Sequence, residues 1–427
     1  MRLPLILLLL GVVLEETVGI PFGIRTAGIL LFALLLLAAL LRRWQQGAGV
    51  LLYGIFIMLG IFATKTDAPQ QSHRCRHTTV ESLASNGMVH QVQQYMDTQR
   101  ARLSAVYREQ GLEGDIYGIT AAMTLGEKQR VSKSLREVYS ITGGAHVFAL
   151  SGMHLSILFM LLSLLLPTER QPRTSAAILL VALWSYVLLV GMHASVLRAA
   201  TMLTVYTLAR SMLLDVKSVD VLALTAFVII TVVPHWLFDV GFQMSFMAVL
   251  SILLFYGPLN RWGLPFIYGP QPYNPLERHP FRDFRKFAVA TLWGLFALSL
   301  TAQMGVAPLV MHYFHRYSCY FWLTNFIVSP AAVIVITLAI ILFLLTAIHT
   351  MLPSIVTAAL LKGTALALKG AVWCINSILT AIAQLPYASI EDIRLNVPQT
   401  ILMYVVIIAI SLLIARLWHI FGKKSWQ

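Results

Sequence analysis

Long apolar runs separated by short polar links dominate the chain. Uninterrupted apolar runs of roughly 18 residues or more are typical of membrane helices. The pattern therefore predicts an all-α polytopic membrane protein with about 11–12 transmembrane helices and a small helical extracytoplasmic segment. The runs lie at 3–20, 26–41, 48–64, 144–166, 174–194, 195–213, 219–233, 236–256, 287–311, 321–347, 354–383 and 398–420.

Two of these runs have unusual lengths. The run at 219–233 is short, and the run at 354–383 is long and contains Lys362 and Lys369. Irregular or broken membrane segments are tolerated only where protein or a wet cavity surrounds them. Each of the two could therefore be a re-entrant or broken segment and not a plain span.

The runs divide the chain into four parts. Residues 1–64 hold three predicted N-terminal transmembrane helices, and 65–143 form a polar extracytoplasmic linker with amphipathic helices. Residues 144–350 form the main block of spans, and 351–427 hold the C-terminal transmembrane helices and a short cytoplasmic tail. Within the polar part, Ser132 is placed to cap a helix.

The composition agrees with a membrane protein and gives it an orientation. Hydrophobic residues make up 58% of the chain and charged residues 11%, and the net charge is +13. The positive charge could attract a polyanion, but cytoplasmic loops of membrane proteins are rich in Lys and Arg whatever they bind. Arg42–Arg43, the 257–286 loop and Lys423–Lys424 fall on one side, which predicts that both termini are cytoplasmic.

The reactive residues do not form a known enzyme motif. Cys75, Cys319 and Cys374 have no metal-ligand spacing, so the sequence predicts neither a metal site nor a cofactor. His312 and His315 have an HxxH spacing but no third ligand nearby. Without a nucleophile triad or a nucleotide-binding loop, we expect no nuclease, ATPase or hydrolase activity. A disulfide between Cys75 and Cys319 is a weaker expectation, since both are predicted on the oxidising side.

A set of polar residues interrupts the run that begins at 144. His146 and His154 share a broad helical face, and Ser151 lies three residues before His154. Gly152 permits close helix packing or a local break. These residues could line a pore at its external entrance, or they could form hydrogen bonds between buried helices.

Further polar residues lie in later runs. Arg198 must reach the membrane interface, a wet cavity or a carboxylate, because its guanidinium stays charged. Asp239 is the best-placed acid, with Gln243 on the same helical face and Gln303 in a later run. An arginine in a groove suits contact with phosphate. Alternatively, Asp239 holds Arg198 in a structural pair.

The loop at 260–287 mixes cations with aromatic residues. Aromatic side chains can stack on bases while cations follow phosphates. The same composition is typical of an interfacial aromatic belt that obeys the positive-inside rule. The residues concerned are Arg261, Trp262, Tyr268, Tyr273, Arg278, Phe281, Arg282, Phe284, Arg285 and Lys286.

The stretch ITAAMTLGEKQRVSKSLREVYSITGGAHVFALSGMHLSILF resembles the competence domain of ComEC-type DNA-uptake proteins. It contains the Leu125–Gly126 turn, an amphipathic helix, the Thr142–Gly143 step, and His146 followed by Ser151-Gly152-Met153-His154. Three further stretches fit in order, at 194–202, 237–255 and 300–333. The resemblance implies that 144–350 is a competence-type transmembrane channel domain.

The chain also departs from the family pattern. Many members carry an OB-like extracellular domain and a metallo-β-lactamase-like nuclease domain. The linker at 65–80 leaves no room for the first, and no His-x-His-x-Asp-His motif indicates the second. We therefore expect a minimal form of the family.

The resemblance implies an inner-membrane channel that imports single-stranded DNA during natural transformation, in the bacterial cytoplasmic membrane. His146, Ser151, Gly152, His154, Arg198, Asp239, Gln243 and Gln303 would then line the DNA path. Its expected partners are single-stranded DNA, membrane lipid, and separate DNA receptor, nuclease, ATPase or strand-binding proteins. The alternatives are an ion- or proton-coupled small-solute transporter, disfavoured by the few intramembrane carboxylates, and a non-transporting membrane paralogue.

Overall fold

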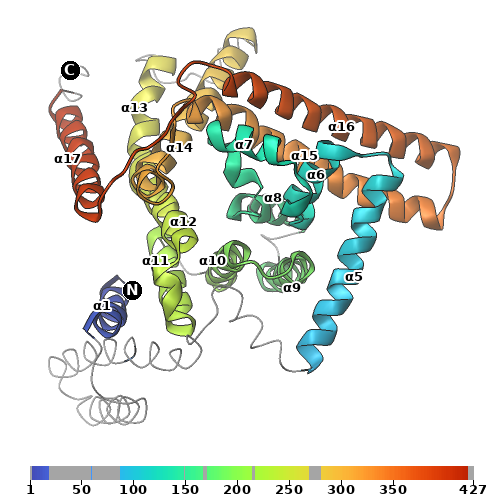
Figure 1. The fold of residues 1–427 in the computed structure, drawn as a ribbon, viewed down its shortest axis with the longest axis horizontal. Coiled ribbons are helices and arrows are strands. Elements are labelled where there is room, and N and C mark those ends of the chain that lie inside the picture. The colour runs from blue at the N-terminus through green and yellow to red at the C-terminus, as the bar shows by residue number, and fades with distance from the viewer. Residues whose placement is uncertain are drawn as a thin grey trace. The chain divides into compact units, whose positions relative to one another are not determined.

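The computed structural model describes residues 2–18, 59, 87–148, 150–166, 171–213, 217–268 and 280–421. These residues form helices almost throughout (Figure 1), which confirms the predicted all-α fold class. Within this part of the chain the strands are β1 (Tyr317–Ser318) and β2 (Ser389–Ile390), which pair antiparallel. The predicted spans at 26–41 and 48–64, the linker at 65–80 and Cys75 lie outside the described residues, so the Cys75–Cys319 disulfide stays a prediction.

Among the described residues, five helices are long and apolar enough to cross a membrane, judged by length and composition. They are Pro172–Val190, Val240–Gly263, Arg285–Phe314, Phe321–Met351 and Ile355–Ala383. Shorter apolar helices cover Gly152–Leu164, Ser218–Val232 and Val397–Leu413. The chain is therefore a multi-pass membrane protein. The two unusual runs are both continuous helices, α11 (Ser218–Val232) and the 29-residue α16 (Ile355–Ala383).

The chain folds into two compact units. One contains residues 1–97 and 159–243, and the other contains 98–158 and 244–427. Three helices cross a boundary between the units: α5 (Gly87–Glu109), α8 (Gly152–Leu164) and α12 (Val240–Ser251).

In the first unit, α1 (Arg2–Val18) packs on α11. α10 (Ala194–Ser211) packs between α9 (Pro172–Val190) and α11. α9 ends at Gly191, whose left-handed backbone (φ 93°) lets the chain turn back into α10. The short helix η4 (Pro234–Phe238) folds onto α11 and leads into α12. Small buried side chains on α10, including Ala199 and Ala200, allow this close packing.

The second unit begins with a group of short helices. These are α6 (Gly114–Leu125), η2 (Lys128–Arg130), α7 (Lys133–Ile141) and η3 (Gly144–Val147). Ser132 caps α7, as predicted, because its side chain accepts a hydrogen bond from the Leu135 amide at 3.3 Å. The Asp115 carboxylate in turn accepts from the Ser132 amide at 3.0 Å, so α6 positions the start of α7.

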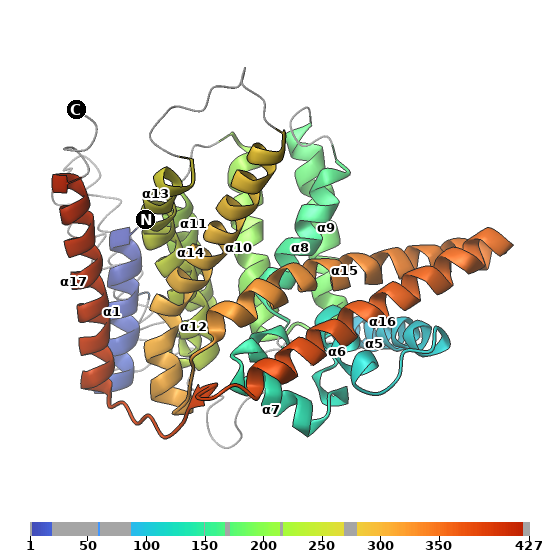
Figure 2. The same cartoon turned by 90° about the horizontal axis from the view of Figure 1, so that it is seen from above.

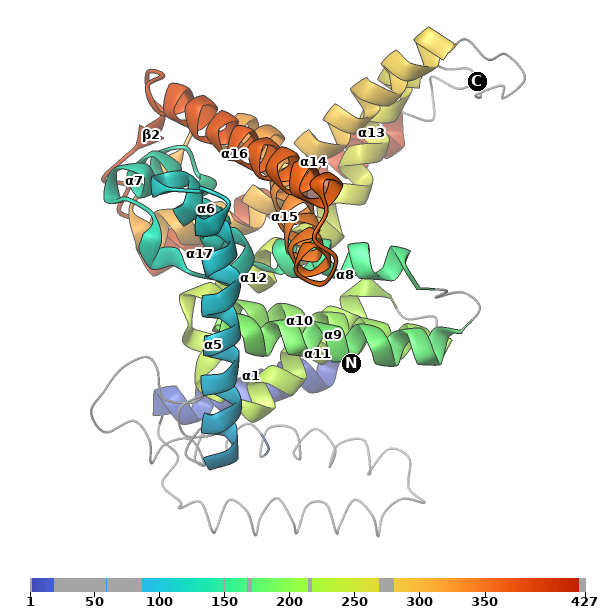
Figure 3. The ribbon, with the colours of Figure 1, turned by 90° about the vertical axis from the view of Figure 1, so that its right-hand side faces the viewer.

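The rest of the second unit is built from long helices. The π-helical turn η5 (Ile252–Tyr256) joins α12 to α13 (Gly257–Tyr268), which packs on α14 (Pro280–Phe314). α14 also contacts α15 (Phe321–Met351) and α17 (Val397–Phe421). Figures 2 and 3 show α15 and α16 lying side by side as an antiparallel pair, with α6 and α7 against it.

A regular seam holds α15 and α16 together. The buried residues of α16 recur at alternating spacings of four and three, the heptad pattern of coiled coils. They are Leu361, Ala365, Leu368, Val372, Ile375, Leu379 and Ile382. α15 supplies a matching row of buried residues that includes Val328, Val335, Ala339 and Leu342. The pair is therefore a single packed hairpin along most of its length.

Gly305 lets α14 approach the end of α12 closely. A Cβ atom at this position would collide with the Met247 carbonyl and would lie 2.8 Å from Cβ of Ser251. Ser251 donates to the Thr301 carbonyl at 2.6 Å, which ties the same two helices. The Tyr404 hydroxyl on α17 donates to the Gly305 carbonyl at 2.7 Å, three residues before Pro308, which lies inside the continuous helix α14 and has no N–H to donate.

Gly305→Ala should therefore destabilise the protein, because the new methyl group meets backbone that cannot rotate away. We expect a loss of about 1–3 kcal/mol, measured as a lower thermal midpoint of the detergent-solubilised protein. Gly363→Ala is the matched control, since its Cβ would meet nothing within 4 Å on α16. Equal midpoints for the two variants would contradict the close packing of α12 and α14.

Candidate functional site

The predicted polar residues of the 144–166 run lie at the junction of η3 and α8. His146 is exposed on η3, and its Nδ1 donates to the Gly143 carbonyl at 3.1 Å. Ser151 directly precedes α8, and Gly152 is the first residue of the helix. His154 follows in the first turn and is 1% exposed. The structure thus places Ser151, Gly152 and His154 together, while His146 bonds within its own turn.

Ser151 and His154 form a reciprocal cap on α8. The Ser151 carbonyl accepts from the His154 amide at 3.1 Å. In return, His154 Nδ1 accepts from the Ser151 amide at 3.2 Å and pairs with the Ser151 hydroxyl at 3.0 Å. The bond from the Ser151 amide to His154 Nδ1 corresponds to one half of a capping box, with histidine in place of the usual Glu or Gln three residues after the cap. The spacing of the Ser-Gly-Met-His motif therefore has a local structural reason.

The same hydrogen bonds assign the tautomer of His154. Because Nδ1 accepts from a backbone N–H, the neutral ring carries its proton on Nε2. Nε2 is buried and has no hydrogen-bond partner among the described residues. A buried donor without a partner is costly and unusual in a native structure. His154 Nε2 is thus a buried donor that the local cap leaves available for a ligand or a water molecule.

The glycines before this junction anchor it to α15. Gly143 has a left-handed backbone (φ 80°), and a Cβ atom there would lie 3.1 Å from the side chain of Ser318. A Cβ on Gly144 would lie 3.4 Å from Thr324. The Thr142 hydroxyl donates to the Val138 carbonyl at 2.9 Å and closes α7. The Thr-Gly-Gly sequence therefore turns the chain from α7 into η3 while letting its backbone lie against the start of α15.

Tyr139 strengthens the same region from α7. Its side chain is fully buried, and its hydroxyl donates to Asn376 Oδ1 on α16 at 2.8 Å. Burial, and to a lesser degree the Asp115 carboxylate, raises the pKa of Tyr139 well above its usual value. The hydroxyl therefore stays protonated and keeps donating at any physiological pH.

In the first unit, Arg198 and Asp239 form an ion pair. Arg198 lies on α10 and is 5% exposed, and its Nη1 is 3.5 Å from Asp239 Oδ1. The Asp239 side chain is 49% exposed. Its Oδ1 also accepts from the Phe242 amide at 2.8 Å and so caps α12. The pair is asymmetric, with a buried cation and a half-exposed anion.

Neighbouring residues fit this pair closely. A Cβ on Gly241 would lie 3.1 Å from Arg198 Nη2 and 3.1 Å from Asp239 Oδ1, so glycine makes room for the guanidinium. Gln243 Nε2 donates to the Leu237 carbonyl at 3.1 Å, which fastens η4 to α12. The predicted Arg198–Asp239 pairing therefore agrees with the geometry, and Gln243 holds the turn beside it.

The predicted path residues are distributed over both units. Arg198, Asp239 and Gln243 belong to the first unit, and the η3–α8 residues belong to the second. Gln303 is half-buried on α14, two residues before Gly305. The structure thus describes two local clusters and one isolated glutamine.

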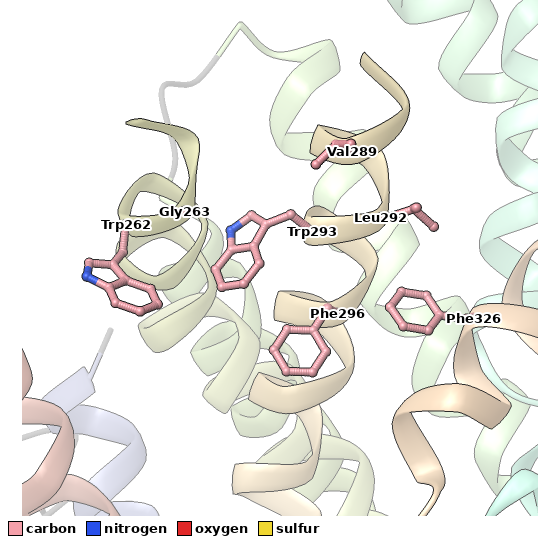
Figure 4. Close-up of a pocket in the computed structure, with 7 residues that line it drawn as sticks. All are labelled: Trp262, Gly263, Val289, Leu292, Trp293, Phe296 and Phe326. Atoms are coloured by element: carbon pink, nitrogen blue, oxygen red, sulfur yellow. The ribbon is translucent and has the colours of Figure 1, made fainter. Parts of the chain in front are cut away.

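The aromatic residues near 260 line an apolar groove of about 490 Å³ between α13, α14 and α15 (Figure 4). Trp262 and Trp293 lie in it with ring centroids 6.0 Å apart, and Trp293 Nε1 donates to the Asn260 carbonyl at 3.3 Å. The other lining residues are Gly263, Val289, Leu292, Phe296 and Phe326. For Trp262, this favours the interpretation as membrane-belt packing over base stacking. Residues 269–279 lie outside the described residues.

Sequence reasoning missed several contacts between distant segments. Arg316 Nη1 lies 2.9 Å from Glu137 on α7, and its Nη2 lies 2.8 Å from Glu391 after β2. His312 Nδ1 donates to the Leu395 carbonyl at 2.7 Å, and His315 Nδ1 pairs with the Ile393 carbonyl at 3.3 Å. The HxxH pair thus fastens the segment that leads into α17. Short-range spacing could not reveal partners more than 70 residues away.

Comparison with known proteins identifies the family. The model of the family described as "Competence protein" matches residues 123–417, which include both clusters and Gln303. The chain belongs to the competence protein family. This confirms the resemblance deduced from the sequence.

Two relatives of this competence protein cover less of it. ComE operon protein 3 of Bacillus subtilis (strain 168) is 30% identical over 220 residues, 51% of this chain and 25% of that protein. An uncharacterized protein of Aquifex aeolicus (strain VF5) is 32% identical over 151 residues, 35% of each chain. The aligned parts thus span about a quarter to a third of these relatives' lengths. No solved structure matches the chain.

Proposed function

We propose that the protein conducts a single strand of DNA across the bacterial cytoplasmic membrane during natural transformation. The observation that carries this proposal is the family match over residues 123–417, which includes every predicted path residue. Two local features support it. The buried Arg198 provides a fixed positive charge suited to phosphate, and His154 Nε2 is a buried donor with no partner among the described residues.

The test is transformation of a strain in which the gene is cleanly deleted. Labelled duplex DNA should still bind to these cells, but label should not become resistant to external nuclease. A plasmid copy of the gene should restore uptake. Normal uptake by the deleted strain would refute the proposal. Altered accumulation of a small solute instead would favour the ion-coupled transporter.

The proposed orientation places both termini in the cytoplasm and the polar segment 65–143 outside. An alkaline-phosphatase fusion after Gln94 should then be active, because this enzyme folds only in an oxidising compartment. A fusion after Arg282 should be inactive, since the basic 257–286 loop is placed inside. The reverse pattern of activities would overturn the orientation.

We further propose that the protein has no nuclease activity and depends on separate receptor, nuclease and ATPase or strand-binding proteins. Among the described residues no group of three or more His, Cys, Asp or Glu could hold a metal ion. The purified protein should therefore leave labelled single- and double-stranded DNA intact with Mg²⁺, Mn²⁺ or Zn²⁺. Cleavage that is lost in His312→Ala or His315→Ala would contradict this expectation.

A further inference from the structure

The turn between α15 and α16 has a composition unsuited to water. From Tyr317 to Leu361 the sequence contains no Asp, Glu, Lys or Arg. The other links that the orientation places in the cytoplasm carry basic residues, as the positive-inside rule requires. If α15 and α16 were two ordinary spans, this link would be cytoplasmic and would be the exception.

The tip of the hairpin, residues 351–356, is apolar and uncovered. Met351 is 82% exposed, Leu352 71%, Ile355 90% and Val356 68%. A contiguous exposed apolar surface of this kind normally contacts lipid or another protein. Because the chain is a membrane protein and residues 351–356 carry no charge, acyl chains are the fitting partner; the nearest charge is Lys362, six residues farther along α16, whose long side chain can extend toward a polar surface.

Several polar groups of the turn pair with one another. Leu352 donates its amide hydrogen to the Ile348 carbonyl at 2.7 Å, and Pro353 has none. The Ser354 amide donates to the Thr357 hydroxyl oxygen at 3.2 Å, and Ser354 Oγ accepts from the Thr357 amide at 3.1 Å in a capping box. His349 Nδ1 pairs with the Thr357 hydroxyl at 2.6 Å. In hydrocarbon, where each unsatisfied polar group is costly, a turn needs this internal pairing.

Both ends of the hairpin are fixed on the same side by polar contacts. Gly143 lies against Ser318 in β1, which directly precedes α15, and Tyr139 bonds to Asn376 near the end of α16. Arg316 joins Glu137 and Glu391 at the base. The base of the hairpin thus holds ion pairs, whereas the charged residue nearest to the tip is the exposed Lys362 on α16.

The course of the hairpin also permits a buried tip. At 1.5 Å per residue, the 31 residues of α15 extend about 46 Å, against roughly 30 Å for a hydrocarbon core. Figure 2 shows α15 and α16 running obliquely to α14 and α17 within their unit. If α14 and α17 follow the membrane normal, the oblique helices traverse less depth than their length.

We propose that α15 and α16 form a re-entrant hairpin whose tip, residues 351–356, is embedded among lipid acyl chains and does not reach the water on the far side. Leu366 and Trp373 on α16, 72% and 64% exposed, add apolar surface toward the base, on a helical face that also carries Lys362 and Lys369. The hairpin then contributes no crossing of the membrane, although each helix is long and apolar enough for one.

A charge placed at the tip tests the proposal. Leu352→Lys should lower the amount of membrane-inserted protein at least about fivefold, because a lysine in hydrocarbon is strongly disfavoured. The control is Met212→Lys, at an exposed apolar residue (64%) on the link after α10 that is placed in the cytoplasm. Its abundance should be unchanged. Unchanged abundance of Leu352→Lys would mean that the tip meets water and would overturn the proposal.

A second measurement locates the tip directly. Pro353→Cys, in a chain with Cys75, Cys319 and Cys374 changed to Ser, should resist a membrane-impermeant maleimide in whole cells and in inside-out vesicles. Lys217→Cys in the same background should react in inside-out vesicles only. A permeant fluorescent maleimide on residue 353 should be quenched by lipids brominated on their acyl chains.

Three other labelling results are possible, and each would decide against the proposal. Labelling of residue 353 in inside-out vesicles would establish two ordinary spans, and labelling in whole cells would place the tip in the external water. Protection from the impermeant maleimide in both preparations, with a permeant label at residue 353 that is not quenched, would mean that protein covers the tip. Any of these three results would refute the re-entrant hairpin, and none depends on DNA transport.

Discussion

Arg198→Gln is expected to reduce DNA uptake at least about tenfold while leaving the abundance of the protein nearly unchanged. Glutamine keeps hydrogen-bonding capacity but removes the fixed charge that we propose attracts phosphate. The change leaves the Asp239 carboxylate without the guanidinium, but this carboxylate is 49% exposed and can be hydrated. Losing a pair with one solvated partner should cost about 1 kcal/mol or less. Immunoblots of membranes and uptake of labelled DNA measure the two effects separately.

A substitution of the other partner, Asp239→Asn, should instead lower the abundance of the protein. Asp239→Asn can still accept from the Phe242 amide, so the cap of α12 is kept. It removes the carboxylate from a guanidinium that is 5% exposed. Removing a countercharge from a buried cation is costly, and we expect about 2–3 kcal/mol of destabilisation and lower abundance. This asymmetry follows from the unequal burial of the two side chains.

The double variant separates the two roles of Arg198. Arg198→Gln with Asp239→Asn removes both charges and should recover normal abundance. If Arg198 attracts the strand, uptake stays impaired at this normal protein level. Full uptake in the double variant would show that Arg198 serves only as the structural partner of Asp239, and would remove it from the transport mechanism.

Local patterns predicted much of the fold. Continuous apolar runs located the long helices, and the cap at Ser132 was correct because capping depends on neighbours within three residues. The run at 354–383 stayed ambiguous because Lys362 and Lys369 interrupt it. The structure shows one unbroken helix here, in which the heptad seam buries the opposite edge of α16 and leaves Lys362 exposed. The seam is visible in the sequence only when α15 is known to be its partner.

The sequence indicated which residues belong to the candidate site, but it did not indicate how most of them contact one another. The pairing of Arg198 with Asp239 could be expected, because few acids are available to a buried arginine. The role of Gly241 could not, because it depends on how closely α12 approaches a side chain 43 positions earlier in the chain. Similarly, His154 was predicted to share a helical face with His146. Its actual partner is Ser151, through a cap that forms only because α8 begins at Gly152.

His154→Asn should abolish most DNA uptake without loss of folded protein. The asparagine Oδ1 occupies the position of His154 Nδ1 and can accept from the Ser151 amide, so the cap on α8 is kept. Its side chain ends short of the point that Nε2 reaches, and the buried donor is lost. If Nε2 contacts the strand or a water molecule on its path, losing one buried hydrogen bond should reduce uptake about tenfold.

Two further substitutions at the same position complete the argument. Gln at position 154 suits a capping box and extends its amide farther than Asn, so it should recover part of the uptake. Leu cannot accept from the Ser151 amide, and should lower the thermal midpoint through loss of the cap, at a cost of about 1 kcal/mol. If uptake in all three variants simply follows protein abundance, His154 acts only as a helix cap. Normal abundance with impaired uptake in His154→Asn is sufficient to assign the function to Nε2, because this variant keeps the interactions made at Nδ1.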